Sequence, residues 1–105
     1  MTVYDGEWLA ATIAAAWTSS AEVNLGKSCS FLQIQIPTLT SATVKIQVAE
    51  SSGGTFYDLG DTQTTTAGTH NYTTTLKLGG FQFIKVVTSV AQGAERLIRV
   101  RGMRY

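Results

Sequence analysis

The chain has little of what most reaction centres require. Of its 105 residues, one is cysteine (Cys29), one is histidine (His70) and one is proline (Pro37). A single cysteine excludes an intrachain disulfide and any metal site built from several thiolates, and a zinc site needs more nitrogen and sulfur ligands than this chain has. We therefore predict no catalytic residues, no metal site and no cofactor, and we do not expect an enzyme.

An excess of charge of one sign is also missing. Eight lysines and arginines oppose seven acidic residues, which gives a net charge of +1. This balance is too small to indicate a protein that binds nucleic acid or an anionic membrane. The apolar stretch Leu9 to Trp17 follows Asp5 and Glu7 instead of basic residues, and it is far shorter than the roughly 20 residues that span a bilayer. We expect no signal peptide, no membrane partner and a soluble product.

What the chain does contain is an alternation of apolar and polar residues with a period of two. Apolar residues alternate with polar ones in three segments, namely Leu32 to Ile36, Val44 to Val48 and Ile98 to Val100. Successive side chains of a strand point to opposite faces, so this period is typical of half-buried strands. Pro37 has no amide hydrogen for a sheet ladder and is expected to end the first of these strands.

Glycines and small polar residues separate the predicted strands. We expect Gly26 to end a short strand, the Ser51 to Gly54 cluster to turn a hairpin, and Gly79-Gly80 to form a tight turn between two strands. Helix and strand remain equally open for Leu9 to Ala16, because its alanines favour a helix whereas Thr12 and Ile13 are β-branched.

These segments predict an all-β fold in a single domain. Seven or eight short strands joined by glycine, serine and threonine turns are the pattern of an antiparallel β-sandwich or jelly roll. We place this domain at residues 21–105. Residues 1–20 would be an N-terminal docking segment, a first strand or a short helix.

Isolated polar residues offer only weak candidates for chemistry. His70 lies in a polar stretch and is interpreted as a solvated loop residue. Asp58 and Asp61 could share a cation, although a turn aspartate that bonds its own backbone is the favoured interpretation. A small hydrolase that uses Asp58, Glu50 or His70 is the least favoured function. Cys29 is expected to pack as a small apolar residue.

The candidate partner-binding residues lie near the two ends of the chain. Tryptophan, tyrosine and arginine are common anchors of protein interfaces, and four of the eight basic residues fall within the last ten positions. We favour a protein partner over nucleic acid. The candidates are Tyr4, Trp8, Trp17, Arg96, Arg99, Arg101 and Arg104.

Several short motifs together resemble a known kind of protein. They are Phe31 to Pro37, Val44 to Val48, Ser52 to Leu59, Phe83 to Val86 and Gln92 to Arg96. This pattern, which covers about residues 21–100, resembles a small virion-protein domain of tailed bacteriophages. Residues 1–20 match nothing in it.

The resemblance implies a structural protein of the virion, assembled in the host cytoplasm. Its most concrete form is a capsid decoration or cement protein that binds the major capsid protein, or other virion proteins, over capsomer junctions, often as a homo-oligomer and preferably a trimer. The alternative is a tail, baseplate or fibre module that binds carbohydrate on Tyr57, Tyr72 or a tryptophan.

Overall fold

Strands make up the regular structure of the computed structural model, which describes residues 4–37, 39, 43–59, 65–66 and 72–104. The strands described are β1 (Tyr4–Asp5), β2 (Leu9–Ile13), β3 (Val23–Ile36), β4 (Thr43–Ala49), β5 (Tyr57–Asp58), β6 (Thr65–Thr66), β7 (Tyr72–Thr88) and β8 (Arg96–Arg104). They pair antiparallel in the order β1-β8-β3-β7-β4-β5, while β2 also pairs with β8 and β6 with β4. The predicted all-β fold is confirmed.

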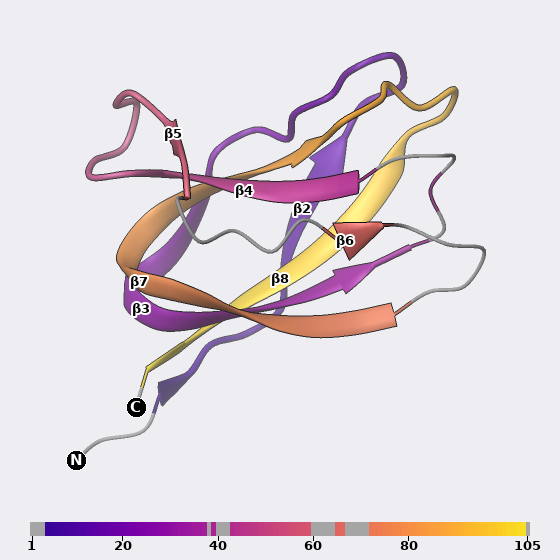
Figure 1. Ribbon diagram of the computed structural model, residues 1–105. Coiled ribbons are helices and arrows are strands. Elements are labelled where there is room, and N and C mark those ends of the chain that lie inside the picture. The colour runs from indigo at the N-terminus through magenta and orange to yellow at the C-terminus, as the bar shows by residue number, and fades with distance from the viewer. Residues whose placement is uncertain (1–3, 38, 40–42, 60–64, 67–71, 105) are drawn as a thin grey trace.

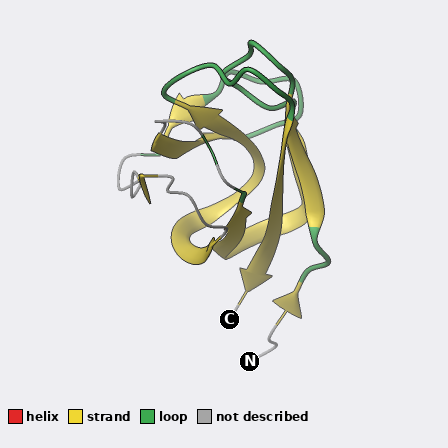
Figure 2. Cartoon of the chain, turned by 90° about the vertical axis from the view of Figure 1, so that its right-hand side faces the viewer, coloured by secondary structure: helices red, strands yellow, loops and turns green. Residues whose placement is uncertain are grey.

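One hydrogen-bonded sheet forms both layers of the sandwich, because β3 and β7 are long and bend together. The second half of β3 pairs with β8 and with the beginning of β7, whereas the end of β7 pairs with β4. Figure 1 shows the two strands curving side by side, and Figure 2 shows the sheet curled around its interior. The layers are thus continuous at the bend.

Glycines in the left-handed region produce these bends. Gly26, Gly79 and Gly80 have φ angles of 88°, 77° and 99°, a backbone conformation that other residues rarely adopt. The pairing of β3 with β7 also shifts register on either side of Cys29, as at a β-bulge. The expectations that Gly26 ends a strand and that Gly79-Gly80 makes a tight turn are wrong, because the chain bends at these glycines and continues in the same strand.

The side chain of Asn24 links β3 and β7 at the bend by hydrogen bonds. Its Oδ1 accepts hydrogen bonds from the backbone N–H of Gly26 and from Nε2 of Gln82, each at 2.8 Å. Gly26 lies in the same strand and Gln82 lies in β7, so one amide oxygen connects both bent strands. The sequence offered no local signal for this contact.

A single core fills the space between the layers. The alternating residues predicted to face inward are buried, and Leu32, Ile34, Ile46, Ile98 and Val100 are almost fully inaccessible. Cys29 is also buried, as expected of a small apolar residue, and burial raises the pKa of its thiol. Gly102 lies against it so closely that a Cβ there would overlap Sγ of Cys29.

Three local predictions have clear outcomes. The Leu9 to Ala16 stretch forms a strand, β2, at Leu9–Ile13, because β8 offers it a pairing edge. The hairpin around Gly53-Gly54 is confirmed, since β5 pairs antiparallel with β4. Strand β3 ends at Ile36, directly before Pro37, as predicted.

Candidate binding sites

Trp8, Arg99, Arg101 and Gln33 form one polar and aromatic group, called here the Trp8 cluster. The guanidinium carbon of Arg101 lies 5.0 Å from the centroid of the Trp8 ring, and that of Arg99 lies 5.8 Å away. Both distances are within the range of cation–π attraction. Nε of Arg101 also donates a hydrogen bond of 2.7 Å to Oε1 of Gln33.

The strand period and the pairing register place these residues together. Arg99 and Arg101 alternate in β8 with buried Ile98 and Val100, so they lie on the outer face of the sheet. Gln33 of β3 lies directly opposite Arg101. Trp8 immediately precedes β2, whose first residue pairs with Val100, and this brings the indole over the same face.

The other predicted interface residues lie elsewhere. Arg96 begins β8 opposite Ile13, and Arg104 ends it opposite Tyr4, whose side chain is outside the described part of the structure. Trp17 lies between β2 and β3, is 65% exposed and borders a hollow of about 450 Å³ that Lys85 also lines. The structure therefore brings Trp8, Arg99 and Arg101 together, and the remaining candidates belong to other parts of the sheet and its loops.

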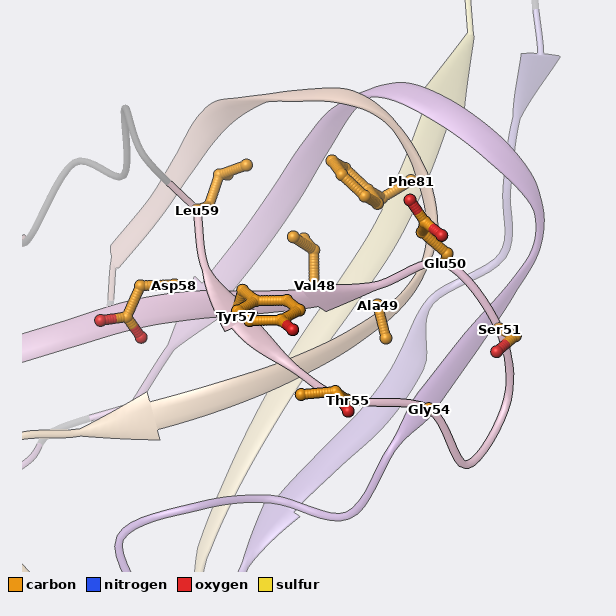
Figure 3. A pocket seen from close by; sticks show the side chains of 10 residues that line it. All are labelled: Val48, Ala49, Glu50, Ser51, Gly54, Thr55, Tyr57, Asp58, Leu59 and Phe81. Carbon is orange, nitrogen blue, oxygen red and sulfur yellow. The ribbon is translucent and has the colours of Figure 1, made fainter.

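A second candidate site is the Tyr57 hollow, a depression of about 520 Å³ beside the β4–β5 hairpin. Figure 3 shows the side chains of Val48, Leu59 and Phe81 converging on it, with Tyr57 in front and Glu50 near Phe81. Tyr57 is 69% exposed. The described lining residues are Val48, Ala49, Glu50, Ser51, Gly54, Thr55, Tyr57, Asp58, Leu59 and Phe81.

Contacts with β4 hold strand β5 in place below this hollow. Asp58 accepts hydrogen bonds of 3.1 Å from Lys45 Nζ and from Gln47 Nε2, and the backbone N–H of Leu59 donates to the carbonyl of Ile46 at 3.1 Å. The hydrogen bonds from Gln47 and Lys45 lower the pKa of Asp58. The interpretation of Asp58 as a turn residue bonding its own backbone is wrong, because it pairs within the sheet. Asp61 and His70 lie outside the described residues.

Glu22 anchors the tip of the same hairpin. Its carboxylate accepts hydrogen bonds of 2.7 Å from Ser52 Oγ and from the backbone N–H of Gly53. These bonds lower the pKa of Glu22, that from Ser52 most strongly. Nζ of Lys85 in β7 lies 4.5 Å from the centroid of the ring of Phe56, which directly precedes β5. The hairpin is thus tied to the body of the sheet at several points.

Within the described residues, no three acidic, histidine or cysteine side chains come together as a metal-binding group. No helix in that part of the chain is long and apolar enough to cross a membrane.

The sequence interpretation missed most of the Tyr57 hollow. It named Tyr57 as a sugar-binding candidate, Glu50 as a hydrolase candidate, and Asp58 as a turn residue, a cation ligand or a hydrolase candidate. Leu59 and Phe81, which form the apolar wall, come from segments far apart in the chain. Only the bend of β7 at Gly79-Gly80 brings Phe81 next to the hairpin, and the sequence does not distinguish that bend from a turn.

Comparison with known proteins reveals similarity of structure only. No model of a protein family matches the sequence, and no curated protein matches it. The SPBc2 prophage-derived protein YomS superposes with a TM-score of 0.63 at 15% identity, covering 98% of this chain and 96% of YomS. The chain has a known fold.

Carbohydrate-binding modules are also similar in structure. A point mutant of a family 29 module superposes with a TM-score of 0.54 at 16% identity, covering 90% of this chain and 67% of the module. A mutant of the module CBM29-2, complexed with mannohexaose, superposes with a TM-score of 0.52 at 12% identity, covering 97% of this chain and 77% of the module. At these identities the similarity establishes the β-sandwich fold, as predicted, and no function.

Proposed function

We propose that this protein is a structural protein of a bacteriophage particle that acts by binding other proteins and catalyses no reaction. The similarity of fold to a prophage-derived protein, over nearly the whole of both chains, supports the phage assignment. The motifs that resemble virion proteins point the same way. In its most specific form, the proposal is a decoration protein that binds the major capsid protein over capsomer junctions as a trimer.

The observation that carries the proposal is the Trp8 cluster. Tryptophan and arginine are enriched among the residues that dominate binding energy at protein interfaces. Stacking on an indole uses the flat face of a guanidinium, so its edge still presents N–H donors to a carboxylate. An acidic patch on a neighbouring subunit fits this surface.

Co-sedimentation with undecorated phage heads tests the proposal. The purified protein is expected to pellet with the heads, and Trp8→Ala or the double variant Arg99→Ala/Arg101→Ala is expected to weaken that association at least about tenfold, as for truncated interface anchors. Trp17→Ala is the matched control, because it removes an indole outside the cluster. Intact heads that bind no protein would refute the decoration role, and equal loss in the Trp17 control would refute the assigned surface.

A second candidate function is a tail, baseplate or fibre module that binds carbohydrate. The similarity of fold to family 29 carbohydrate-binding modules supports it, as does the exposed Tyr57 ring beside a hollow. A glycan array probed with the intact protein tests this candidate. The absence of binding to every glycan on the array would reject it.

A further inference from the structure

We infer that the Tyr57 hollow binds one uncharged pyranose ring of a glycan, stacked on the Tyr57 side chain. The inference rests on the second candidate function, which it deepens by naming the site and the class of sugar. It is independent of the Trp8 cluster, which lies on the outer face of the sheet around β8.

The apolar part of the hollow suits the C–H face of a sugar. Tyr57 is 69% exposed, so one face of its ring is available to a ligand. The side chains of Val48, Leu59 and Phe81 converge behind the Tyr57 ring and form the apolar wall of the hollow. Concave sites with aromatic and aliphatic walls and a few polar groups are the usual form of small-ligand sites, and about 520 Å³ lies within their range.

Polar groups at the rim can bind the sugar hydroxyls. Glu50 follows β4 directly, and its exposed carboxylate stands beside Phe81 (Figure 3). Hydroxyl groups that donate to a carboxylate form short, strong hydrogen bonds. Ser51 and Thr55 add two hydroxyl groups to the lining.

Charge selects against acidic sugars. The described lining residues include no lysine or arginine, whereas Glu50 adds a negative charge. The carboxylate of Asp58 points away from the hollow and is paired with Lys45 at 3.1 Å. A uronic or sialic acid would therefore place its carboxylate near that of Glu50 with no cation between them, which is unfavourable.

The hollow is preorganised, because the hairpin that forms it is fixed at both ends. Its tip is bonded to Glu22, and its return strand is bonded to Lys45, Gln47 and Ile46. A site that is already ordered loses less conformational entropy when a ligand binds.

The hollow of about 450 Å³ beside Trp17, called here the Trp17 hollow, is the competing location for the sugar. The charged side chain in its lining is basic, whereas Glu50 in the Tyr57 hollow is acidic. The Trp17 hollow also has an exposed aromatic ring, but Lys85 lines it and no described acidic residue does. A sugar carboxylate bound there would have the Lys85 ammonium nearby, whereas the described lining of the Tyr57 hollow contains no basic side chain. The two hollows thus predict different ligands as well as different critical residues.

Calorimetric titration of the full chain decides between the hollows. The probes are mannohexaose and a second neutral hexasaccharide from the glycan array, compared with sialyllactose and an oligogalacturonate. We expect the neutral probes to bind and the acidic ones to bind at least about tenfold more weakly, a factor that corresponds to one unfavourable charge contact.

Four variants assign the site. Tyr57→Ala is expected to weaken binding of the neutral sugar at least about tenfold, whereas Tyr57→Phe, which keeps the ring, stays within about threefold of the unaltered chain. Glu50→Gln removes the negative charge of the lining, so it is expected to reduce the difference in affinity between neutral and acidic probes. Trp17→Ala is the matched control and is expected to leave affinity unchanged. Circular dichroism verifies that each variant is folded.

The outcomes separate the site from the function. No binding of any probe or arrayed glycan refutes the carbohydrate function together with the site. Binding that is abolished by Trp17→Ala and unaffected by Tyr57→Ala keeps the function and refutes the Tyr57 hollow. Binding of acidic probes alone refutes the charge argument and with it the assignment of an uncharged sugar.

Discussion

The centre of the sheet and its β4–β5 edge differ in what their side chains contact. At the centre, β3 lies between β7 and β8, and Ile34 and Val100 are fully buried opposite each other. At the edge, β5 has two residues, both exposed, and polar contacts to β4 hold it in place, while Glu22 bonds the tip of the hairpin. Side chains at the centre are enclosed by protein, whereas those at the edge remain available to a ligand.

This difference separates stability from binding. Burial of apolar side chains is the dominant favourable contribution to folding, so changes at the centre should reduce the free energy of unfolding. Exposed residues contribute little to it, so changes at Tyr57 or on the outer face should affect binding and leave stability nearly unchanged. Substitutions at buried and at exposed positions, compared in pairs, test whether stability depends on the centre and binding on the exposed residues.

The largest effect is expected for Ile34→Ala. Removing a fully buried side chain between two paired strands should lower the free energy of unfolding by about 2–5 kcal/mol. Urea denaturation followed by tryptophan fluorescence measures this. Leu97→Ala in β8 is the control, because Leu97 is 53% exposed and its loss should cost less than about 0.5 kcal/mol. Equal costs for the two variants would contradict the contrast between buried and exposed positions.

Gly102→Ala should have the next largest effect. The added methyl group would overlap Sγ of Cys29 and contact Leu25, which costs about 1–3 kcal/mol in a packed core. Gly93→Ala is the control, since its Cβ would meet open space. Cys29→Ala in the Gly102→Ala background should recover part of the loss, as a double-mutant cycle would reveal. A Gly102→Ala variant as stable as the control would show that the core around Cys29 can accommodate the added methyl group.

Gly80→Ala tests the bend itself. Nothing lies within 4 Å of the added methyl group, so the expected cost of about 1–2 kcal/mol comes from its φ of 99°. Thermal unfolding of this variant and of Lys77→Ala, an exposed position in the same strand, provides the measurement. A loss of stability no larger than that of the Lys77 variant would mean that the bend does not require a glycine.

The smallest effect is expected at the edge, from the Asp58 carboxylate. Its pKa is lowered in the folded protein by hydrogen bonds from Gln47 and Lys45, so the stabilisation is present above the ordinary carboxyl pKa of about 3.9 and is lost as the pH falls through the lowered value. Asp58→Asn should reduce the unfolding temperature slightly at pH 7.

The same variant should behave like the unaltered protein in strong acid. Calorimetric unfolding between pH 2 and pH 7 checks both expectations. Because the Lys45–Asp58 pair is exposed, high salt should also diminish the difference at pH 7. A difference that grows as the pH falls would contradict the assignment.

Prediction from the sequence succeeded where the signal is local. The alternation at Leu32 to Ile36 and Val44 to Val48 identified strands and their buried faces, because one buried face imposes a period of two. It failed at Gly79-Gly80, since two glycines permit both a tight turn and a bend in a continuous strand. Pairing with β3 on both sides of the bend decided in favour of the bend.

For the candidate sites, the sequence provided residues without their neighbours. It identified Trp8, Arg99 and Arg101 as interface candidates, but nothing in it indicated that the indole lies against both guanidiniums. It identified Tyr57 as a candidate for sugar binding, but not the apolar wall of the hollow formed by Leu59 and Phe81. Both groupings depend on which strands pair.

By itself the sequence determined that this protein is an antiparallel β-sandwich with one core, because the spacing of apolar and polar residues specifies which faces leave water. Only the tertiary structure decided where the sheet folds over itself and which exposed side chains meet. Those outcomes depend on long-range pairing, in which residues far apart in the chain become neighbours, and such contacts leave no period in the sequence.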